Sequence, residues 1–275
     1  MDIWIGTSGY SYPSWVGDFY PRGTRPRQML SYYAQQFPLV ELNFTFYRPP
    51  TTAMLARQAE QTPPGFQFLV KLPRSLSHEQ TTDDLSGFRR AALELRQRGQ
   101  LLGLLCQLPQ ATHNKAPARR WLEFLAGELF DLGLAVEFRH RSWAVPDVAP
   151  WLAERHVDLV SVDVPDLPGL YPRSMVRSGP TVYVRLHSRD AAKWYLAGAD
   201  RYDYDYTDGE LQDWIDATEE TARQAGVGRF LFLFNNCAGS LAAHNARRLR
   251  EMLGQQMPQS NVIAPTAPVE RSLFD

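Results

Sequence analysis

Two glutamates and two histidines are the side chains of this sequence best suited to acid and base chemistry. They are Glu41, Glu137, His78 and His187. Carboxylates and imidazoles transfer protons in enzymes when burial and neighbouring charges bring their pKa values toward neutrality. We therefore predict these four residues as catalytic groups. For His78 a role as a simple loop cap is an equal alternative, because it follows the third strand-like run.

Cationic, amide and aromatic side chains are predicted to bind the substrate. Lys71, Arg139 and Arg185 fit phosphate or carboxylate groups, since ammonium and guanidinium donors pair with anionic oxygens. The remaining predicted binding residues are polar groups at strand ends and rings that stack on sugars or bases: Asn43, Gln107, Asp163, Asn235, Tyr47, Trp143 and Trp194. Trp194 is predicted to belong to a lid. The competing interpretation is structural, with the cations paired to Glu41, Glu137 and Asp163 in a buried network.

The same acidic groups and one imidazole are also potential ligands of a divalent metal. Glu41, Glu137, Asp163 and His187 supply the oxygen and nitrogen atoms that such metals use. Three cations nearby oppose a metal, and the sequence has no H-x-E, H-E-x-x-H or clustered histidine pattern. The sequence therefore names no cofactor, and a divalent metal is an alternative that we do not favour.

Eight short apolar runs must position these side chains. They span residues 3–7, 39–43, 66–71, 101–107, 134–139, 157–163, 181–187 and 229–235, and amphipathic stretches separate most of them, as in repeated βα units. Within the runs, apolar residues alternate with polar ones near the carboxyl ends. In a barrel the apolar set faces the helices and the other set points inward. We therefore expect the polar set to meet at the carboxyl ends of the strands, where barrel enzymes place their chemistry.

The fold class that follows is α/β, a (β/α)8 TIM-type barrel formed by residues 1–254 as one domain. Residues 164–180 contain four prolines and two glycines, so a regular helix between the sixth and seventh strands is not expected. Residues 255–275 are predicted to form a proline-containing C-terminal tail.

Seven motifs carry a resemblance to a known family. In chain order they are GTSGY, ELNFTFYRPP, FLVKLPRSLSH, CQLP, VEFRHRSW, YVRLHSR and LFNNCAGSLAAHNA. Their order and spacing resemble the YecE-like family, also catalogued as domain of unknown function 72, over residues 3–253. The resemblance implies a (β/α)8 barrel and no established activity. The chain departs from the family pattern at Ser188, where HGR is frequent, and at Cys237, where Asp or His is frequent, which leaves the role of Cys237 open.

The composition of the chain argues against a nucleic-acid-binding, secreted or membrane protein. The 275 residues include 29 basic and 30 acidic side chains, a balance without the overall positive charge of a nucleic-acid-binding protein. The start of the chain lacks signal-peptide features, and no run approaches the roughly 18 apolar residues of a membrane span. With two cysteines and no disulfide framework, we expect a cytoplasmic protein without membrane contact.

We expect an enzyme, a hydrolase, lyase or isomerase, that uses acid and base chemistry on a small anionic or sugar-containing substrate. A nucleic-acid binding or processing protein similar to barrel endonucleases is the alternative. A third hypothesis is docking of a partner through the tail segment Ser272-Leu273-Phe274.

Overall fold

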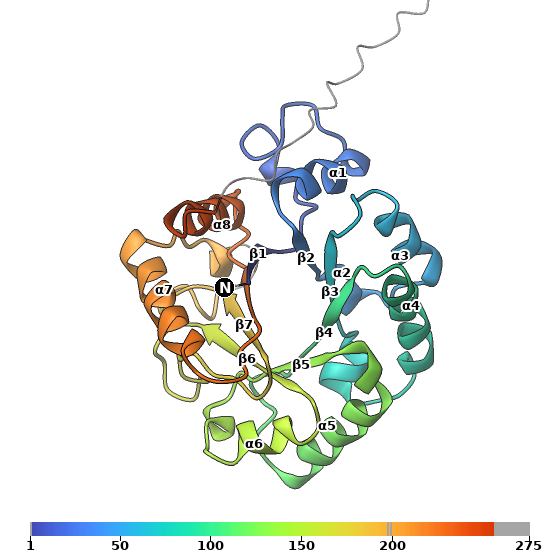
Figure 1. Cartoon of the computed structure of the whole chain (residues 1–275), viewed down its shortest axis with the longest axis vertical. Helices are drawn as coiled ribbons and strands as arrows, with labels where there is room; N and C mark the ends of the chain where they lie inside the picture. Colours follow the sequence, from blue (N-terminus) through green and yellow to red (C-terminus); the bar gives the residue numbers. More distant parts are fainter. Residues whose placement is uncertain (1, 197, 199, 256–275) are drawn as a thin grey trace, which may run out of the picture.

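A closed parallel barrel of eight strands forms the centre of the molecule (Figure 1). The computed structural model describes residues 2–196, 198 and 200–255. The strands follow chain order around the barrel, and β8 pairs with β1. Their bounds are β1 Ile3–Ser8, β2 Leu39–Leu42, β3 Gln67–Lys71, β4 Leu101–Gln107, β5 Leu134–Glu137, β6 Asp158–Asp163, β7 Thr181–Leu186 and β8 Arg229–Phe234. The predicted barrel is confirmed, and each predicted run overlaps one strand.

Helices surround the barrel (Figure 1). Apolar residues at helical spacing, such as Leu211, Trp214 and Ile215, face the strands. The helices are α1 Pro26–Gln36, α2 Phe44–Tyr47, α3 Thr52–Ala59, α4 Leu85–Gln97, α5 Ala116–Glu128, α6 Val148–Ala153, α7 Asp208–Ala222 and α8 Leu241–Met252. No helix of the described residues is long and apolar enough to cross a membrane.

The connection between β6 and β7 contains no helix, as the prolines predicted. Residues 164–180 run as an irregular segment over the outside of the barrel. Ser161 on β6 anchors this segment, because its Oγ accepts from Val176 N at 2.9 Å and donates to Val176 O at 3.2 Å. An isolated antiparallel β-bridge between His140 and Leu170 anchors the segment at a second point.

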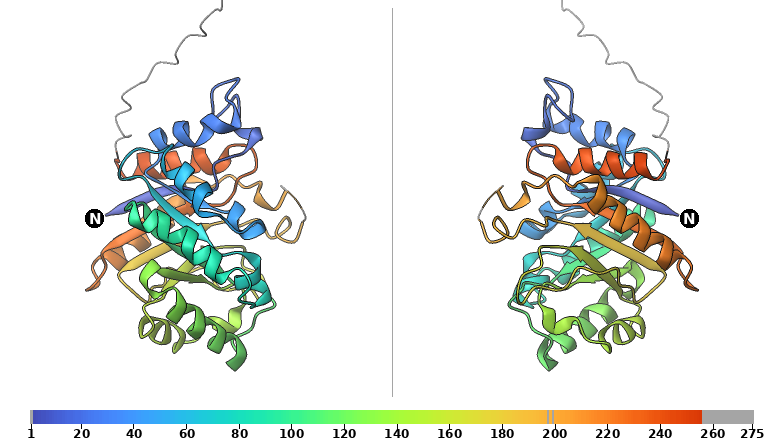
Figure 2. Two further views of the ribbon diagram at one scale, coloured as in Figure 1. Left: turned by 90° about the vertical axis from the view of Figure 1, so that its right-hand side faces the viewer. Right: turned by 90° about the vertical axis from the view of Figure 1, so that its left-hand side faces the viewer.

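The carboxyl ends of all eight strands open at one end of the barrel. Residues 188–196 and 200–207 extend from that end, opposite the N-terminus (Figure 2). The predicted tail, residues 255–275, lies outside the described residues except for Gln255, whose Nε2 donates to Ile3 O at 3.0 Å. The docking segment Ser272-Leu273-Phe274 is therefore also outside them.

Candidate active site

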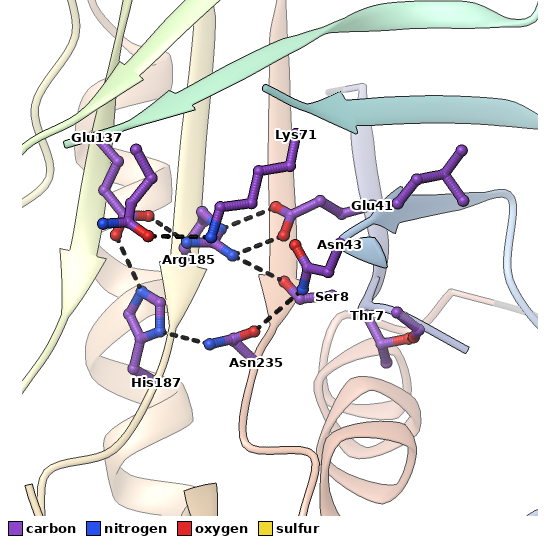
Figure 3. A network of polar contacts seen from close by, with 12 residues as sticks. Thr7, Ser8, Glu41, Asn43, Lys71, Glu137, Arg185, His187 and Asn235 are labelled. Atoms are coloured by element: carbon purple, nitrogen blue, oxygen red, sulfur yellow. Dashed lines mark hydrogen bonds and ion pairs between the residues drawn. The ribbon is translucent and has the colours of Figure 1, made fainter. Parts of the chain in front are cut away.

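Arg185 on β7 lies at the centre of the polar side chains inside the barrel (Figure 3). Its Nε donates to Glu41 Oε2 at 2.8 Å and its Nη2 to Glu41 Oε1 at 2.6 Å, the paired geometry of a guanidinium with a carboxylate. Its Nη1 donates to Glu137 Oε2, and Nη2 also lies 3.4 Å from Ser8 Oγ. The Arg185 side chain is 1% exposed, so two carboxylates rather than water compensate its charge.

The two glutamates are fully buried acceptors in this arrangement. Glu41 also accepts from the Tyr183 hydroxyl, and Glu137 also accepts from Arg139 Nε. Burial opposes the ionisation of Glu137, but Arg139 and Arg185 hold its pKa well below the usual range. We call Glu41, Glu137, Tyr183 and Arg185 the inner cluster. The two carboxylates of this cluster are paired with arginines in a buried network, as the structural interpretation of the sequence expected.

His187 connects the inner cluster to two asparagines. Its Nε2 lies 3.2 Å from Arg139 Nη2 and 3.6 Å from Glu137 Oε1, and its Nδ1 lies 2.9 Å from Asn235 Nδ2. Asn43 Nδ2 donates to Asn235 Oδ1 at 3.5 Å (Figure 3). Burial and then the charge of Arg139 lower the pKa of His187 well below its usual value. The imidazole is therefore neutral.

Lys71 at the end of β3 has a different environment. Its Nζ donates to Gln107 Oε1 at 3.0 Å and lies 4.7 Å from the centre of the Phe46 ring. It forms no ion pair with any carboxylate of the described residues. Burial, followed by the positive charge of Arg185, lowers the pKa of Lys71 to about 8. Its amine consequently exchanges its proton close to neutral pH.

Two adjoining cavities open at the strand ends, with volumes of about 320 Å³ and 250 Å³. We call the pair the mouth cavity. Five side chains line both parts: Tyr47, Lys71, Gln107, Arg139 and Tyr202. The first part is also lined by Phe46, His78, Trp194 and Arg201, among others, and the second by Asn43, Arg185, Asn235 and Cys237, among others. The lining of the mouth cavity includes neither Glu41 nor Glu137.

His78 and Trp194 lie where the sequence predicted, beside the mouth cavity. His78 is part of a short π-helix, Ser75–Glu79, and burial together with the charge of Lys71 lowers its pKa to about 4. Trp194 is buried between two guanidinium groups, with Arg139 Cζ 5.7 Å and Arg201 Cζ 4.2 Å from its ring centre. The shift toward neutrality expected for the acid and base groups is not seen for these three: burial and then nearby cations lower the pKa of His78 and His187, and Arg139 and Arg185 lower that of Glu137.

Two predicted binding residues do not reach the mouth cavity. The strand register pairs Val162 with Arg185 and Asp163 with Leu186, so Asp163 points to the outside of the barrel. There its Oδ2 accepts from Trp214 Nε1 at 2.5 Å, and both Oδ atoms accept from Arg189 Nε at 3.0 Å. The predicted inward direction of Asp163 is wrong, because the outer side of β6 offers its carboxylate partners.

Trp143 is the second of these residues. It is 1% exposed and stacks on Phe138, with ring centres 4.1 Å apart. Its Nε1 donates to Thr112 O at 2.8 Å. The ring thus packs in the outer core, and its predicted place as a wall of the pocket is wrong.

The sequence analysis missed several contributors to the site, among them Tyr183, Phe46, Arg201 and Tyr202. Tyr183 shares the inward parity of Arg185, so the alternation rule could have found it. Phe46 and Arg201 lie in connections after β2 and β7, and no spacing rule places connection residues. The structure shows that these connections fold over the strand ends, which brings Phe46 and Arg201 to the mouth cavity.

The metal alternative finds no grouped ligand set in the described part of the chain. No three His, Cys, Asp or Glu side chains there are placed to hold a metal ion, and Asp163 lies away from Glu41, Glu137 and His187. Cys237 Sγ donates to Ser8 O at 3.3 Å, and burial raises the pKa of this thiol to about 12. At neutral pH the thiol is therefore protonated.

Comparison with known proteins gives relatives along nearly the whole chain. A protein called UPF0759 protein YunF from Bacillus subtilis is 26% identical over 279 aligned positions, which cover 91% of this chain and 94% of the relative. The crystal structure of a DUF72 family protein from Thermotoga maritima is similar, with a TM-score of 0.85, 34% identity and coverage of 93% of this chain and 100% of the other. A DUF72 family protein from Enterococcus faecalis has the same fold, with a TM-score of 0.81, 24% identity and coverage of 92% and 96%.

The family comparison agrees with these relatives. The family described as "Protein of unknown function DUF72" matches residues 4–271. It is the same family as the YecE-like proteins that the strand-end motifs resemble. The chain therefore belongs to the DUF72 family.

Proposed function

We propose that the mouth cavity is the active site of an enzyme for a small anionic substrate bearing a phosphate or a carboxylate. The observation that carries the proposal is the state of Lys71. Its ammonium lines both parts of the mouth cavity and has an amide oxygen, but no carboxylate of the described residues, as its partner. Lys71 is half-buried. A cation partly withdrawn from water without a counter-ion costs free energy, and an anionic ligand would supply the missing charge.

The charge balance around Lys71 supports the same proposal. Lys71, Arg139 and Arg185 face the two carboxylates of Glu41 and Glu137, which leaves one positive charge uncompensated. The neutral His187 does not change this excess. Arg139 contacts Glu137 and still lines both parts of the mouth cavity, so it is the second group that we assign to the anion.

For the proton-transfer step we assign Lys71 in place of the two glutamates. General acids and bases work best when their pKa lies near the operating pH. The pKa of Lys71, about 8, meets that condition, whereas the pKa of Glu137 lies far below it. The neutral imidazole of His78 lines the same cavity and is assigned a hydrogen-bonding role beside Lys71. Tyr47, Gln107 and Trp194 remain assigned to the walls.

The test is binding of simple anions by isothermal titration calorimetry at pH 7 and low salt. Inorganic phosphate, glycolate and 2-hydroxyethyl phosphate serve as probes. We expect saturable binding, and a loss of at least about tenfold in affinity for Lys71→Met, since a charge-assisted hydrogen bond contributes about 1.5 to 3 kcal/mol. The matched control is Lys115→Met, because Lys115 is an exposed lysine before α5. Absence of binding for all three probes, or equal binding by the two variants, would overturn the proposal.

We also propose a cytoplasmic location. The support is that both cysteines, Cys106 and Cys237, are free thiols, which fits a reducing compartment.

A further inference from the structure

Lysine is a rare residue in this chain, and one lysine occupies the mouth cavity. Of the 29 basic Lys and Arg residues only three are lysines: Lys71, Lys115 and Lys193. Every other cation of the site is an arginine, whose planar guanidinium is the better partner for a phosphate or carboxylate. The positive charge alone therefore does not explain why position 71 is a lysine. What a lysine has and an arginine lacks is a primary amine that loses its proton when it is buried.

We propose that Lys71 Nζ is a nucleophile that forms an imine with the carbonyl carbon of a small aldehyde or ketone carrying a phosphate or carboxylate group. This inference rests on the proposed function, because it needs the mouth cavity to bind a small anion. It adds the substrate class, an anionic carbonyl compound, and a covalent role for one residue.

The surroundings of Nζ suit this reaction. No carboxylate of the described residues holds the ammonium as an ion pair, so a carbonyl group does not have to displace one. The Phe46 ring lies 4.7 Å away and excludes water on one side, while Gln107 Oε1 orients the nitrogen from 3.0 Å. Arg139 lines the same cavity and can hold the anionic end of the substrate while its carbonyl carbon approaches Nζ.

The protonation state of Lys71 is consistent with nucleophilic attack. A lysine must lose its proton before its nitrogen can attack a carbonyl carbon. With a pKa of about 8, about one quarter of Lys71 side chains are unprotonated at pH 7.5, against about one in a thousand for an ordinary lysine. Desolvation beside other cations is a recognised way in which enzymes prepare such a lysine.

The atoms of the step balance without an added reagent. The nitrogen lone pair attacks the carbonyl carbon, a C–N bond forms, and the oxygen takes up a proton from the nitrogen to give a carbinolamine. Loss of the C–O bond then releases water, which carries away the carbonyl oxygen and both hydrogens of the free amine, and the imine remains. His78, neutral and in the same cavity, can pass the proton from nitrogen to the leaving oxygen.

Reductive trapping tests the inference on the full chain. The protein is incubated at pH 7.5 with glyoxylate or glycolaldehyde phosphate, treated with borohydride, digested and mapped by mass spectrometry. We expect the adduct on Lys71 at a rate at least about tenfold above Lys115 and Lys193, which serve as internal controls. Lys71→Arg keeps the positive charge but lacks a primary amine, so no adduct should form at position 71 and the labelling of Lys115 and Lys193 should be unchanged.

The two proposals fail in different ways. If glycolate and 2-hydroxyethyl phosphate bind but the three lysines react equally, or Lys71 does not react, the imine is overturned and the anion site stands. If inorganic phosphate, glycolate and 2-hydroxyethyl phosphate all fail to bind, the proposed function falls and the imine falls with it. An adduct confined to Lys71, together with binding of these anions by the wild type, supports both.

Discussion

The inner cluster and Lys71 lie side by side at the strand ends, yet their charges are handled in opposite ways. Arg185 is enclosed by Glu41 and Glu137 on three nitrogen atoms, and both carboxylates are fully buried. Lys71 has an amide oxygen and an aromatic ring as neighbours and lines the open cavity. The sequence analysis assigned acid and base chemistry to Glu137 and only a binding role to Lys71. The pattern of partners reverses that assignment.

The difference shows that a cation enclosed by carboxylates, such as Arg185, stabilises the site, whereas a cation without a carboxylate partner, such as Lys71, can take part in its chemistry. Glu41 and Glu137 already accept charge-assisted hydrogen bonds, and for Glu137 the two arginines keep the pKa well below its usual range. The two carboxylates position Arg139 and Arg185, and these in turn help to lower the pKa of Lys71. The inner cluster thus positions the other groups of the site, whereas Lys71 is the group that can bind an anion and exchange a proton.

The largest effect is expected when the inner cluster loses one charge. In Glu137→Gln, Arg139 and Arg185 would face each other without the carboxylate between them. Removing one partner of a buried pair costs about 3 to 5 kcal/mol, and we expect that loss in the free energy of unfolding measured with urea at pH 7. Because the pKa of Glu137 is depressed in the folded state, its contribution is present above the unfolded pKa of about 4.3 and is lost as the pH falls. The difference between wild type and variant should therefore shrink in acid.

An exposed ion pair is the matched control for that experiment. Glu79 pairs with Arg74 at 2.9 Å, but their side chains are 52% and 66% exposed. Glu79→Gln should change the free energy of unfolding by no more than about 1 kcal/mol. Equal losses in Glu79→Gln and Glu137→Gln would contradict the distinction between the inner cluster and ordinary surface pairs.

The second largest effect should have the opposite sign. Lys71→Met removes a half-buried cation whose charged form is destabilised by the fold, so we expect the free energy of unfolding at pH 7 to rise by about 1 to 3 kcal/mol. The penalty of the charged lysine is fully present below its folded pKa of about 8 and disappears as the pH rises past 10.5, its usual value. Urea titrations at pH 7 and pH 10.5 measure both limits. A destabilised variant at pH 7 would show that Lys71 is a structural residue.

The sequence predicted most of this arrangement because alternation in a strand is a strict geometric rule. It placed Glu41, Lys71, Gln107, Glu137 and Arg185 inside the barrel, since their apolar neighbours had to face the helices. It could not assign partners. Which cation pairs with which carboxylate depends on side-chain reach across strands that are distant in the sequence, and alternation carries no information about that.

The rule failed on β6 for a physical reason. It assumes that the outer side of every strand meets only apolar surface, but polar groups from the irregular segment 164–180, from Arg189 and from α7 reach the outer side of β6. Backbone groups of Val176 satisfy Ser161 there, and Trp214 with Arg189 satisfies Asp163. Polar residues are therefore tolerated outside the barrel at this strand.

Asp163 provides the third test, because its carboxylate is as buried as that of Glu137 but lies on the other side of the sheet. Asp163→Ala should lower the free energy of unfolding by about 1 to 2 kcal/mol, since Arg189 and Trp214 lose their acceptor. Binding of inorganic phosphate, followed by calorimetry, should stay within about twofold of wild type. A tenfold loss would show that the outer side of β6 is coupled to the mouth cavity.

The smallest effect is expected at the rim, where Tyr47 lines both parts of the mouth cavity but is 84% exposed. Tyr47→Ala should change the free energy of unfolding by no more than about 0.5 kcal/mol, as for other surface substitutions. Phosphate affinity, measured by calorimetry, should fall by less than about threefold, because the ring forms a wall and carries no charge. If the loss in phosphate affinity instead approached that of Lys71→Met, Tyr47 would have to close over the bound anion. Tyr47 would then be a binding residue and not only part of the cavity wall.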